Sequence, residues 1–181
     1  MPRKQNNTGP TTAAGDPIPI RRAETVYIET SGVSYLVSRP SRDLIVAAHQ
    51  QLRREWWDRR PALLRCFVSD VVLDEVRQGD AEQAALRLKA LEGLPKLAAT
   101  AEAEQMAAAF LKELLPSKAA RDAAHLAIAA VGKIKYLLTW NCNHLANAQW
   151  LDRLEPIAGA AGFKLPRVCT PEELMGDSNY E

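Results

Sequence analysis

The chain of 181 residues lacks several features that mark broad classes of protein. Its formal net charge is only +1, so no overall field draws it to nucleic acid or to a membrane, and any binding of a polyanion must depend on a local group of cations. No segment reaches the ~20 apolar residues that a membrane-spanning helix needs. The N-terminus carries charges but no apolar segment typical of a signal peptide. We therefore expect no membrane association.

Cysteine is also scarce. Cys66, Cys142 and Cys169 are widely spaced, odd in number and without a C-x-x-C pair, which argues against a disulfide framework and against a zinc knuckle. Free cysteine is among the most buried residue types, so we expect each to be a small apolar side chain in the core. This usage favours a reducing compartment, and the cytoplasm is the simplest one.

The two ends of the chain differ from the rest. Residues 1–23 are rich in Pro, Gly, Thr and Asn and show no apolar periodicity, which predicts a disordered N-terminal tail. A cloning remnant or a misassigned start would look the same, and a basic arm is the functional alternative, built from Arg3, Lys4, Arg21 and Arg22. Residues 177–181 are expected to form a C-terminal tail. A length of 181 residues suits one domain, which we place at residues 24–176.

Short apolar runs alternate with segments of helical periodicity along this domain. Strands are predicted at 25–28, 63–68, 94–98, 134–139 and 167–170, and helices at 34–38, 42–59, 70–78, 81–91, 101–115, 119–131 and 149–161. Strands that alternate with helices predict a parallel sheet covered by helices on both faces, which is an α/β fold.

The longest predicted helix, at 42–59, has the clearest single pattern. Ser41 is its expected N-cap. Its apolar residues recur at spacings of four and predict one buried stripe, made of Leu44, Ala48, Leu52 and Trp56.

Acidic side chains stand where strands are predicted to end. Glu29 follows the apolar run 25–28, and Glu75, Asp122 and Asn141 lie in segments that can reach the same edge of the sheet. Ligands bind at the carboxyl ends of strands in open parallel sheets. Carboxylates gathered without matching Lys or Arg repel one another, so such a cluster normally binds a cation. The pattern predicts a divalent-metal site and phosphodiester chemistry. Taken singly, each acid has a simpler reading as a solvated side chain, and Asp122 also suits the first turn of a helix.

Four segments in order carry a resemblance to a known family: Tyr27–Ser31, Val68–Val76, Asp122–Ala129 and Tyr136–Asn141. Together they resemble the PIN domain family of metal-dependent ribonucleases, and more narrowly the VapC-type toxins of type II toxin–antitoxin pairs, over about residues 25–174. The resemblance implies a three-layer α/β/α sandwich on a parallel sheet. It further implies cleavage of single-stranded RNA with Mg²⁺ or Mn²⁺, an antitoxin partner and a homodimer.

The resemblance assigns roles to five residues. Glu29, Glu75 and Asp122 would be the metal ligands, and Thr139 and Asn141 would orient a bound water or a ligand. The family usually has Asp where Glu29 and Asn141 stand. Asn keeps an acceptor oxygen but loses the charge. Three carboxylates therefore remain, which is enough for one metal ion.

Substrate contacts are predicted from nearby cations. Arg39 and Arg42 are candidates for phosphate contacts near the metal or for contacts with the antitoxin. His125 lies one helical turn after Asp122 and could hydrogen-bond that carboxylate, contact phosphate or simply pack in the core. His144 in the following loop is expected to line the same cleft.

A locally basic segment gives a further candidate for RNA binding. Arginines beside Trp56 and Trp57 suit single-stranded RNA through phosphate pairing and stacking, and they are Arg53, Arg54, Arg59, Arg60 and Arg65. The competing interpretation is a solvated helix end with Trp56 in the core. Three functional alternatives also stay open: a nuclease for DNA, a phosphatase, or a PIN-like module that binds RNA or protein with weak or no nuclease activity.

Overall fold

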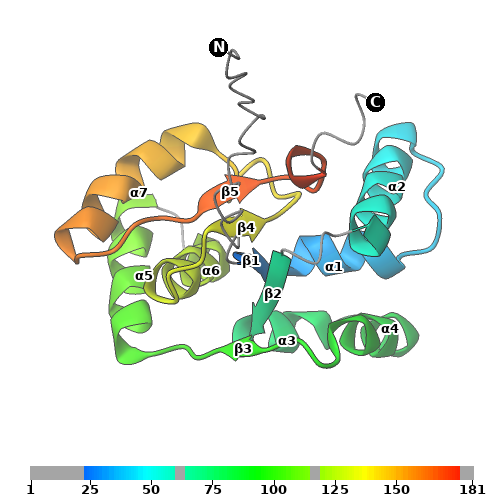
Figure 1. The fold of residues 1–181 in the computed structure, drawn as a ribbon, viewed down its shortest axis with the longest axis horizontal. Helices are drawn as coiled ribbons and strands as arrows, with labels where there is room; N and C mark the ends of the chain where they lie inside the picture. Colours follow the sequence, from blue (N-terminus) through cyan, green and yellow to red (C-terminus); the bar gives the residue numbers. More distant parts are fainter. Residues whose placement is uncertain (1–22, 60–63, 115–118, 176–181) are drawn as a thin grey trace, which may run out of the picture.

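The structure is a computed structural model that describes residues 23–59, 64–114 and 119–175. All but residue 23 of the predicted N-terminal tail at 1–23, the predicted C-terminal tail at 177–181, the basic arm and Arg60 lie outside the described residues. Five parallel strands form one sheet in the order β3-β2-β1-β4-β5 (Figure 1). The strands are β1 (Glu24–Ile28), β2 (Leu64–Ser69), β3 (Lys96–Leu97), β4 (Tyr136–Leu138) and β5 (Arg167–Cys169).

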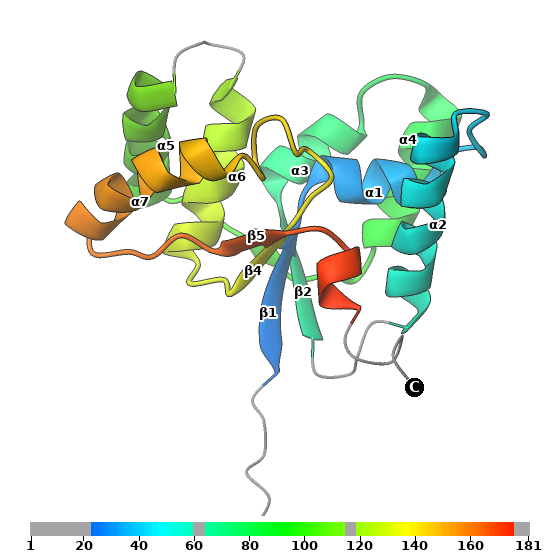
Figure 2. The same ribbon diagram turned by 90° about the horizontal axis from the view of Figure 1, so that it is seen from above.

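Helices cover both faces of the sheet. They are α1 (Thr30–Val37), α2 (Leu44–Arg59), α3 (Asp70–Val76), α4 (Ala81–Leu91), α5 (Ala101–Leu114), α6 (Ala120–Val131) and α7 (Ala148–Ala160), followed by the 3-10 turn η2 (Glu172–Leu174). Figure 2 shows α5, α6 and α7 on one side of the sheet and α1, α2 and α4 on the other. The predicted three-layer α/β/α fold on a parallel sheet is confirmed.

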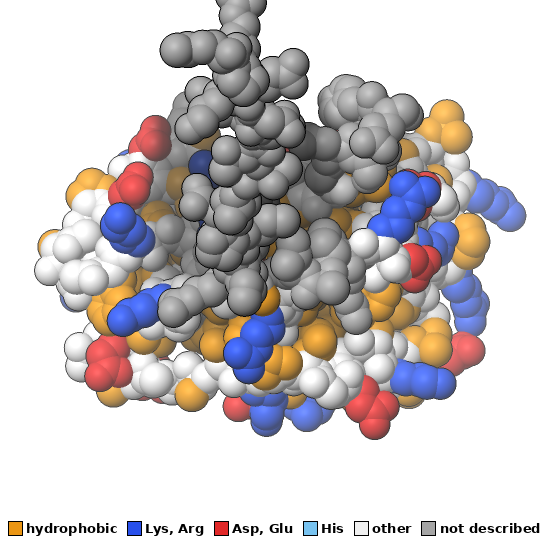
Figure 3. All heavy atoms as spheres, viewed as in Figure 1, with side chains coloured by type: hydrophobic (Ala, Val, Ile, Leu, Met, Phe, Trp, Pro, Cys, Tyr) orange, Lys and Arg blue, Asp and Glu red, His pale blue; other side chains and the backbone are white. Residues whose placement is uncertain are grey.

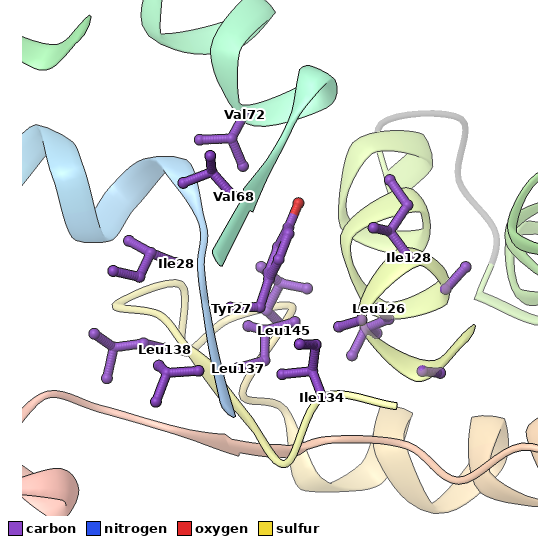
Figure 4. Packing of buried hydrophobic residues seen from close by; sticks show 14 of the residues in the cluster. Tyr27, Ile28, Val68, Val72, Leu126, Ile128, Ile134, Leu137, Leu138 and Leu145 are labelled. Atoms are coloured by element: carbon purple, nitrogen blue, oxygen red, sulfur yellow. The ribbon is translucent and has the colours of Figure 1, made fainter. Parts of the chain in front are cut away.

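The central strand β1 is buried because it pairs with a neighbour on each side. Val26, Tyr27 and Ile28 are fully buried, as the apolar run predicted. The core cluster around them takes side chains from β2, α3, α6 and β4 as well, and Figure 4 shows Val72, Leu126 and other members of this set. Burial on both faces explains why this strand reads as a continuous apolar run rather than an alternating one.

Helix α2 contradicts two predictions. Its N-terminal N–H groups are capped by Asp43, whose carboxylate accepts from the backbone N–H of residues 45 and 46, and Ser41 instead caps Asp43 itself. The predicted stripe is wrong in its first half, because Leu44 is 87% exposed and Ala48 is exposed as well, whereas Leu52 is partly buried and Trp56 is buried as predicted.

The buried face of α2 is formed by Gln50, Arg53 and Trp56. The Gln50 amide is satisfied by backbone groups of residues 39 and 41. Arg53 donates from Nε to the Gly32 carbonyl at 2.6 Å, and its guanidinium lies 4.7 Å from the ring centroid of Trp56. A pattern of apolar residues alone cannot find this face, because two of its three members are polar and are buried through hydrogen bonds.

Smaller differences concern element ends and cysteines. Strand β3 is only two residues long, and α1 begins four residues earlier than predicted. Cys66 and Cys169 are buried as expected, but Cys142 is exposed. Within the described residues, no helix combines the length and the apolar character that crossing a membrane would require.

Candidate active site

Glu29 is the N-cap of α1, which explains the early start of that helix. Its carboxylate accepts from the backbone N–H of Ser31 at 2.9 Å and of Gly32 at 3.2 Å, and from the Ser31 hydroxyl. The side chain is only 4% exposed. A carboxylate is favourable at this position because the first N–H groups of a helix lack partners and the helix dipole is positive there. Ser31 also accepts from the Trp140 backbone N–H at 2.8 Å, which ties the end of β1 to the end of β4.

Glu75 lies on α3 and faces the start of α1. One carboxylate oxygen accepts from the Thr30 hydroxyl and lies 3.0 Å from His125 Nε2, and the other is 3.4 Å from an Arg121 nitrogen. Burial by itself would raise the pKa of Glu75. The hydrogen bonds from His125 and Thr30, the electrostatic attraction of His125 and the positive charge of Arg121 nevertheless hold that pKa below its usual value.

A buried chain of hydrogen bonds supports Glu75 from behind. His125 Nδ1 lies 2.8 Å from the Tyr27 hydroxyl, which lies 2.6 Å from the Ser69 hydroxyl. Because the Glu75 carboxylate only accepts, a neutral His125 donates from Nε2 and its Nδ1 then accepts from Tyr27. Burial raises the pKa of Tyr27 far above its ordinary value, so the tyrosine stays protonated and can donate. His125 therefore holds Glu75. It is buried in the core, which was one of its three predicted roles, and among the described residues no hydrogen bond joins it to Asp122.

Asp122 stands in the first turn of α6, as predicted. Its carboxylate accepts from the Asn141 side-chain amide at 3.0 Å and lies 3.0 Å from His144 Nδ1. Burial raises the pKa of Asp122, the electrostatic attraction of His144 and His125 and the hydrogen bond with His144 lower it, and the nearby charge of Glu29 raises it. The effect of Glu29 shows that two of the three acids are close enough to repel each other.

The residues after β4 hold Asn141 in place. Its backbone N–H donates to the Thr139 hydroxyl at 2.8 Å, and its side-chain oxygen accepts from the His144 backbone N–H at 3.2 Å. Thr139 is buried. His144 also stacks on Trp150, with ring centroids 4.9 Å apart and planes 2° apart. Asn141 therefore connects Asp122 to the loop that carries His144.

The structure brings six of the eight predicted site residues to one edge of the sheet: Glu29, Glu75, Asp122, His125, Thr139 and Asn141. The two arginines are elsewhere. Arg39 follows the far end of α1, about 12 Å along an eight-residue helix, and its exposed side chain pairs with Glu82 at 3.0 Å. Arg42 is exposed ahead of α2. Within residues 23–59, 64–114 and 119–175, no hydrogen bond or ion pair joins either arginine to the acids, so their binding of substrate stays a prediction.

The basic segment is divided by burial. Arg53 is fully buried in the core and cannot contact RNA, which contradicts one part of that prediction. Arg54 donates to the Ser38 carbonyl at 3.2 Å, whereas Arg59 and Arg65 are exposed. Trp56 is buried beside Arg53, as the competing interpretation expected.

Several residues of the site were not found from the sequence. Thr30 and Ser31 place hydroxyls on Glu75 and Glu29, and Arg121 reaches Glu75 from the residue before Asp122. The Thr-Ser-Gly sequence after a strand-ending acid is a signal for a helix start that could have identified the two hydroxyls.

A divalent metal ion can be tested against the donors present. The described residues contain no group of three or more His, Cys, Asp or Glu that could hold a metal ion as they stand. The donor chemistry nevertheless suits a hard cation, because carboxylate oxygens from three elements and an amide oxygen gather at one edge, and two of the carboxylates repel each other. A metal ion would have to replace present partners of these acids, such as His144 on Asp122.

The fold is similar to that of a solved toxin, VapC20. VapC20 of Mycobacterium tuberculosis, a Sarcin-Ricin loop cleaving toxin, matches with a TM-score of 0.52 and 18% identity over 78% of this chain and 99% of that chain. VapBC2 of Rickettsia felis, solved with a DNA fragment from its promoter, matches with a TM-score of 0.48 and 13% identity over 81% of this chain and 98% of that chain. No family model and no curated protein matches the sequence. The chain therefore has the fold of a VapC-like PIN domain.

Proposed function

We propose that this protein is an endoribonuclease of the PIN type, which hydrolyses phosphodiester bonds of single-stranded RNA with Mg²⁺ or Mn²⁺. The observation that supports the proposal is the position of Glu29 at the end of β1, with Glu75 on α3 and Asp122 at the start of α6 near the same edge of the sheet, on a fold similar to that of a Sarcin-Ricin loop cleaving toxin. In this proposal the three acids hold the ion. When bound, the ion would activate a water and neutralise charge on the phosphate.

The neighbouring side chains would position these ligands. His125, fixed by Tyr27, holds Glu75 from the protein side, and Thr139 orients Asn141 against Asp122. Partners of this kind fix the orientation of metal ligands and tune their basicity. Ser31, bound to Glu29, does the same for the first acid.

Binding of the substrate needs a local source of positive charge, because the chain as a whole is nearly neutral. Among the described side chains visible in Figure 3, Lys and Arg are spread among Asp and Glu and do not form one continuous basic surface. Among the described Lys and Arg side chains, Arg121 contacts one of the three acids, and it is half exposed beside Glu75. We propose that it contacts the phosphate that is cleaved, in addition to the predicted contacts from Arg39 and Arg42.

The biological setting proposed with this activity is that of a toxin. The chain would act in the cytoplasm, form a homodimer and be held inactive by a cognate antitoxin. Co-expression with the product of a small neighbouring gene, followed by size-exclusion chromatography, tests this part. A complex that blocks RNA cleavage supports this setting. Unchanged RNA cleavage in the presence of the product of each neighbouring gene contradicts it.

The central test is cleavage of single-stranded RNA with Mg²⁺ or Mn²⁺ by purified protein. Asp122→Asn keeps the size of the side chain but removes a charge from the site, and we expect a fall in rate of about 10²-fold or more, as for loss of a major electrostatic contact. Asp152→Asn is the matched control, because Asp152 is exposed on α7, and it should cleave like the wild type. Cleavage by Asp122→Asn at the wild-type rate would show that the activity belongs to another site or a contaminant. DNA and phosphomonoester substrates in the same assay test the two enzymatic alternatives.

A second candidate function is a PIN-like module that binds RNA or protein with weak or no cleavage. The observations that favour it are the neutral Asn141 in place of an acid and the use of Glu29 as a helix cap. Two measurements separate the functions. The module binds RNA with the same affinity with and without metal ions, and it releases no cleavage product.

A further inference from the structure

A second site of a different character lies at the opposite end of the sheet. A hollow of about 820 Å³ opens between the connection from α6 to β4 and the connection from α7 to β5. Tyr136 and Arg167, the first residues of β4 and β5, are register partners at its floor. In Figure 2, β1 starts at this end of the sheet, whereas α1 and α6 begin at the other end, where the acids lie.

The lining of this basic hollow carries four cations and no acid: Lys133, Lys135, Lys164 and Arg167. Lys135 is paired with Glu24 of β1. The other three are exposed, and within the part of the chain that the structure describes no carboxylate forms an ion pair with them. Three uncompensated charges therefore face one cavity in a chain whose net charge is only +1.

Aromatic rings contribute the apolar part of the lining. Tyr136 and Phe163 are half-buried and border the hollow together with the four cations. The ammonium group of Lys135 lies 5.0 Å from the Tyr136 ring centroid. Cations with aromatic faces are the combination that binds single-stranded nucleic acid, because phosphates pair with the charges and bases stack on the rings.

The backbone conformation of Lys133 is a second feature that marks the lining of the hollow. Lys133 has φ of 53°, and it is the non-glycine residue with positive φ among those described. Gly132, next to it, has an ordinary φ of −69°, and an added Cβ there would lie 2.9 Å from the Ile128 carbonyl oxygen. Lysine thus occupies the left-handed position after α6, where glycine is usual, and this unfavourable conformation brings its side chain to the lining of the hollow.

A simpler explanation accounts for only part of the charge. Lys133 and Lys164 follow the C-termini of α6 and α7, where the helix dipole favours cations. It does not explain why Arg167 and Lys135, which come from the starts of strands, line the same cavity as the two rings.

We propose that the basic hollow binds the phosphates of a single-stranded nucleic acid. It would guide a part of that nucleic acid that lies far from the acids at the other end of the sheet. Lys135 and Asn141 are six residues apart across β4, which corresponds to about 20 Å in an extended strand. A stacked strand covers that distance in about six nucleotides at roughly 3.4 Å each. The identification of the strand as the RNA substrate rests on the proposed function, whereas binding of phosphates in the hollow does not.

The experiment measures binding without cleavage, by fluorescence anisotropy of a labelled 12-nucleotide RNA in EDTA. One variant combines Lys133→Asn, Lys164→Gln and Arg167→Gln; asparagine is used at the first position because it tolerates positive φ. The control combines Lys89→Gln, Lys96→Gln and Lys112→Gln, which removes three charges from exposed positions on α4, β3 and α5. Thermal melting confirms that both variants are folded.

We expect the hollow variant to bind at least about tenfold more weakly at 50 mM salt, and the slope of log affinity against log salt to become about 2 units shallower, at about 0.7 for each lost phosphate contact. The control should bind like the wild type. Equal affinities for the hollow variant and the wild type, or equal losses in both variants, would overturn the proposal. So would binding of AMP as tight as that of the RNA, because the site would then take a mononucleotide.

The same samples separate this inference from the proposed function. Loss of binding in the hollow variant of a protein that never cleaves RNA supports the hollow and contradicts the nuclease. If the protein cleaves RNA with metal ions but the hollow variant binds RNA as tightly as the wild type, the result supports the nuclease and contradicts the hollow.

Discussion

The Tyr27 hydroxyl offers a sharp test of the buried network behind Glu75. Tyr27→Phe removes one oxygen from a fully buried position and leaves the ring in place, so packing in the core is unchanged. The substitution breaks hydrogen bonds to Ser69 at 2.6 Å and to His125 Nδ1 at 2.8 Å. Ser69 keeps a weak bond from the Val72 N–H at 3.4 Å, whereas His125 Nδ1 is left buried without its acceptor interaction.

The expected cost follows from these losses. A buried polar group left without a partner costs about 1–3 kcal/mol, and two groups are affected, one of them partly. We therefore expect Tyr27→Phe to lower the free energy of unfolding by about 2–4 kcal/mol. For a domain of this size, such a loss corresponds to a fall in Tm of roughly 4–16 °C.

Urea unfolding followed by tryptophan fluorescence measures this effect. Tyr35→Phe is the matched control. Tyr35 makes ring contacts with His49 and Trp140, and among the described residues no hydrogen bond uses its hydroxyl. This substitution should therefore change the free energy of unfolding by no more than about 0.5 kcal/mol. A double variant with His125→Leu should show a coupling of about 0.5–3 kcal/mol. Equal stability of Tyr27→Phe and the wild type would refute the view that these buried hydrogen bonds hold His125.

Other predictions follow from burial and close contacts. Arg53→Met should destabilise the domain by about 1–3 kcal/mol in the same unfolding assay, because a backbone carbonyl of α1 loses its charged donor; unchanged stability would show that this buried bond contributes nothing net. Gly132→Ala should destabilise, since its Cβ would lie 2.9 Å from a carbonyl oxygen, while Gly159→Ala in the open surface of α7 should be neutral or stabilise by up to about 1 kcal/mol; the reverse order would contradict the packing. At pH 8 an alkylating reagent should modify Cys142 rapidly, whereas burial raises the pKa of Cys169 to about 12, so that only about 10⁻⁴ of it is thiolate; mass spectrometry of the native protein should find Cys169 unmodified until the chain unfolds.

Much of the site was accessible from the sequence because strand ends are local signals. An apolar run that stops at an acid places Glu29 at the edge of the sheet, and the same logic holds for Thr139 and Asn141 after β4. Asp122 in the first turn of α6 was equally predictable. These positions depend on local periodicity and on the rule that parallel strands share one ligand-binding edge.

Which group contacts which acid depended on distances that the sequence does not contain. For His125 the sequence left open a bond to Asp122, a phosphate contact or packing in the core. In the structure it is buried, with one ring nitrogen beside Glu75 on α3 and the other beside Tyr27. His144, a loop residue, takes the place beside Asp122. A histidine can bond in two directions, and neighbours remote in sequence select between them.

The amino-acid sequence alone determined the alternation of strands and helices, the burial of β1 and the set of acids at the strand ends, because each follows from periodicity over a few residues. Only the tertiary structure decided that α2 buries Gln50 and Arg53, and that cations from the α6–β4 and α7–β5 connections line one hollow. Burial of a polar side chain depends on a partner elsewhere in the chain, here a carbonyl 21 residues away from Arg53. A contact of that kind exists only once the chain has folded.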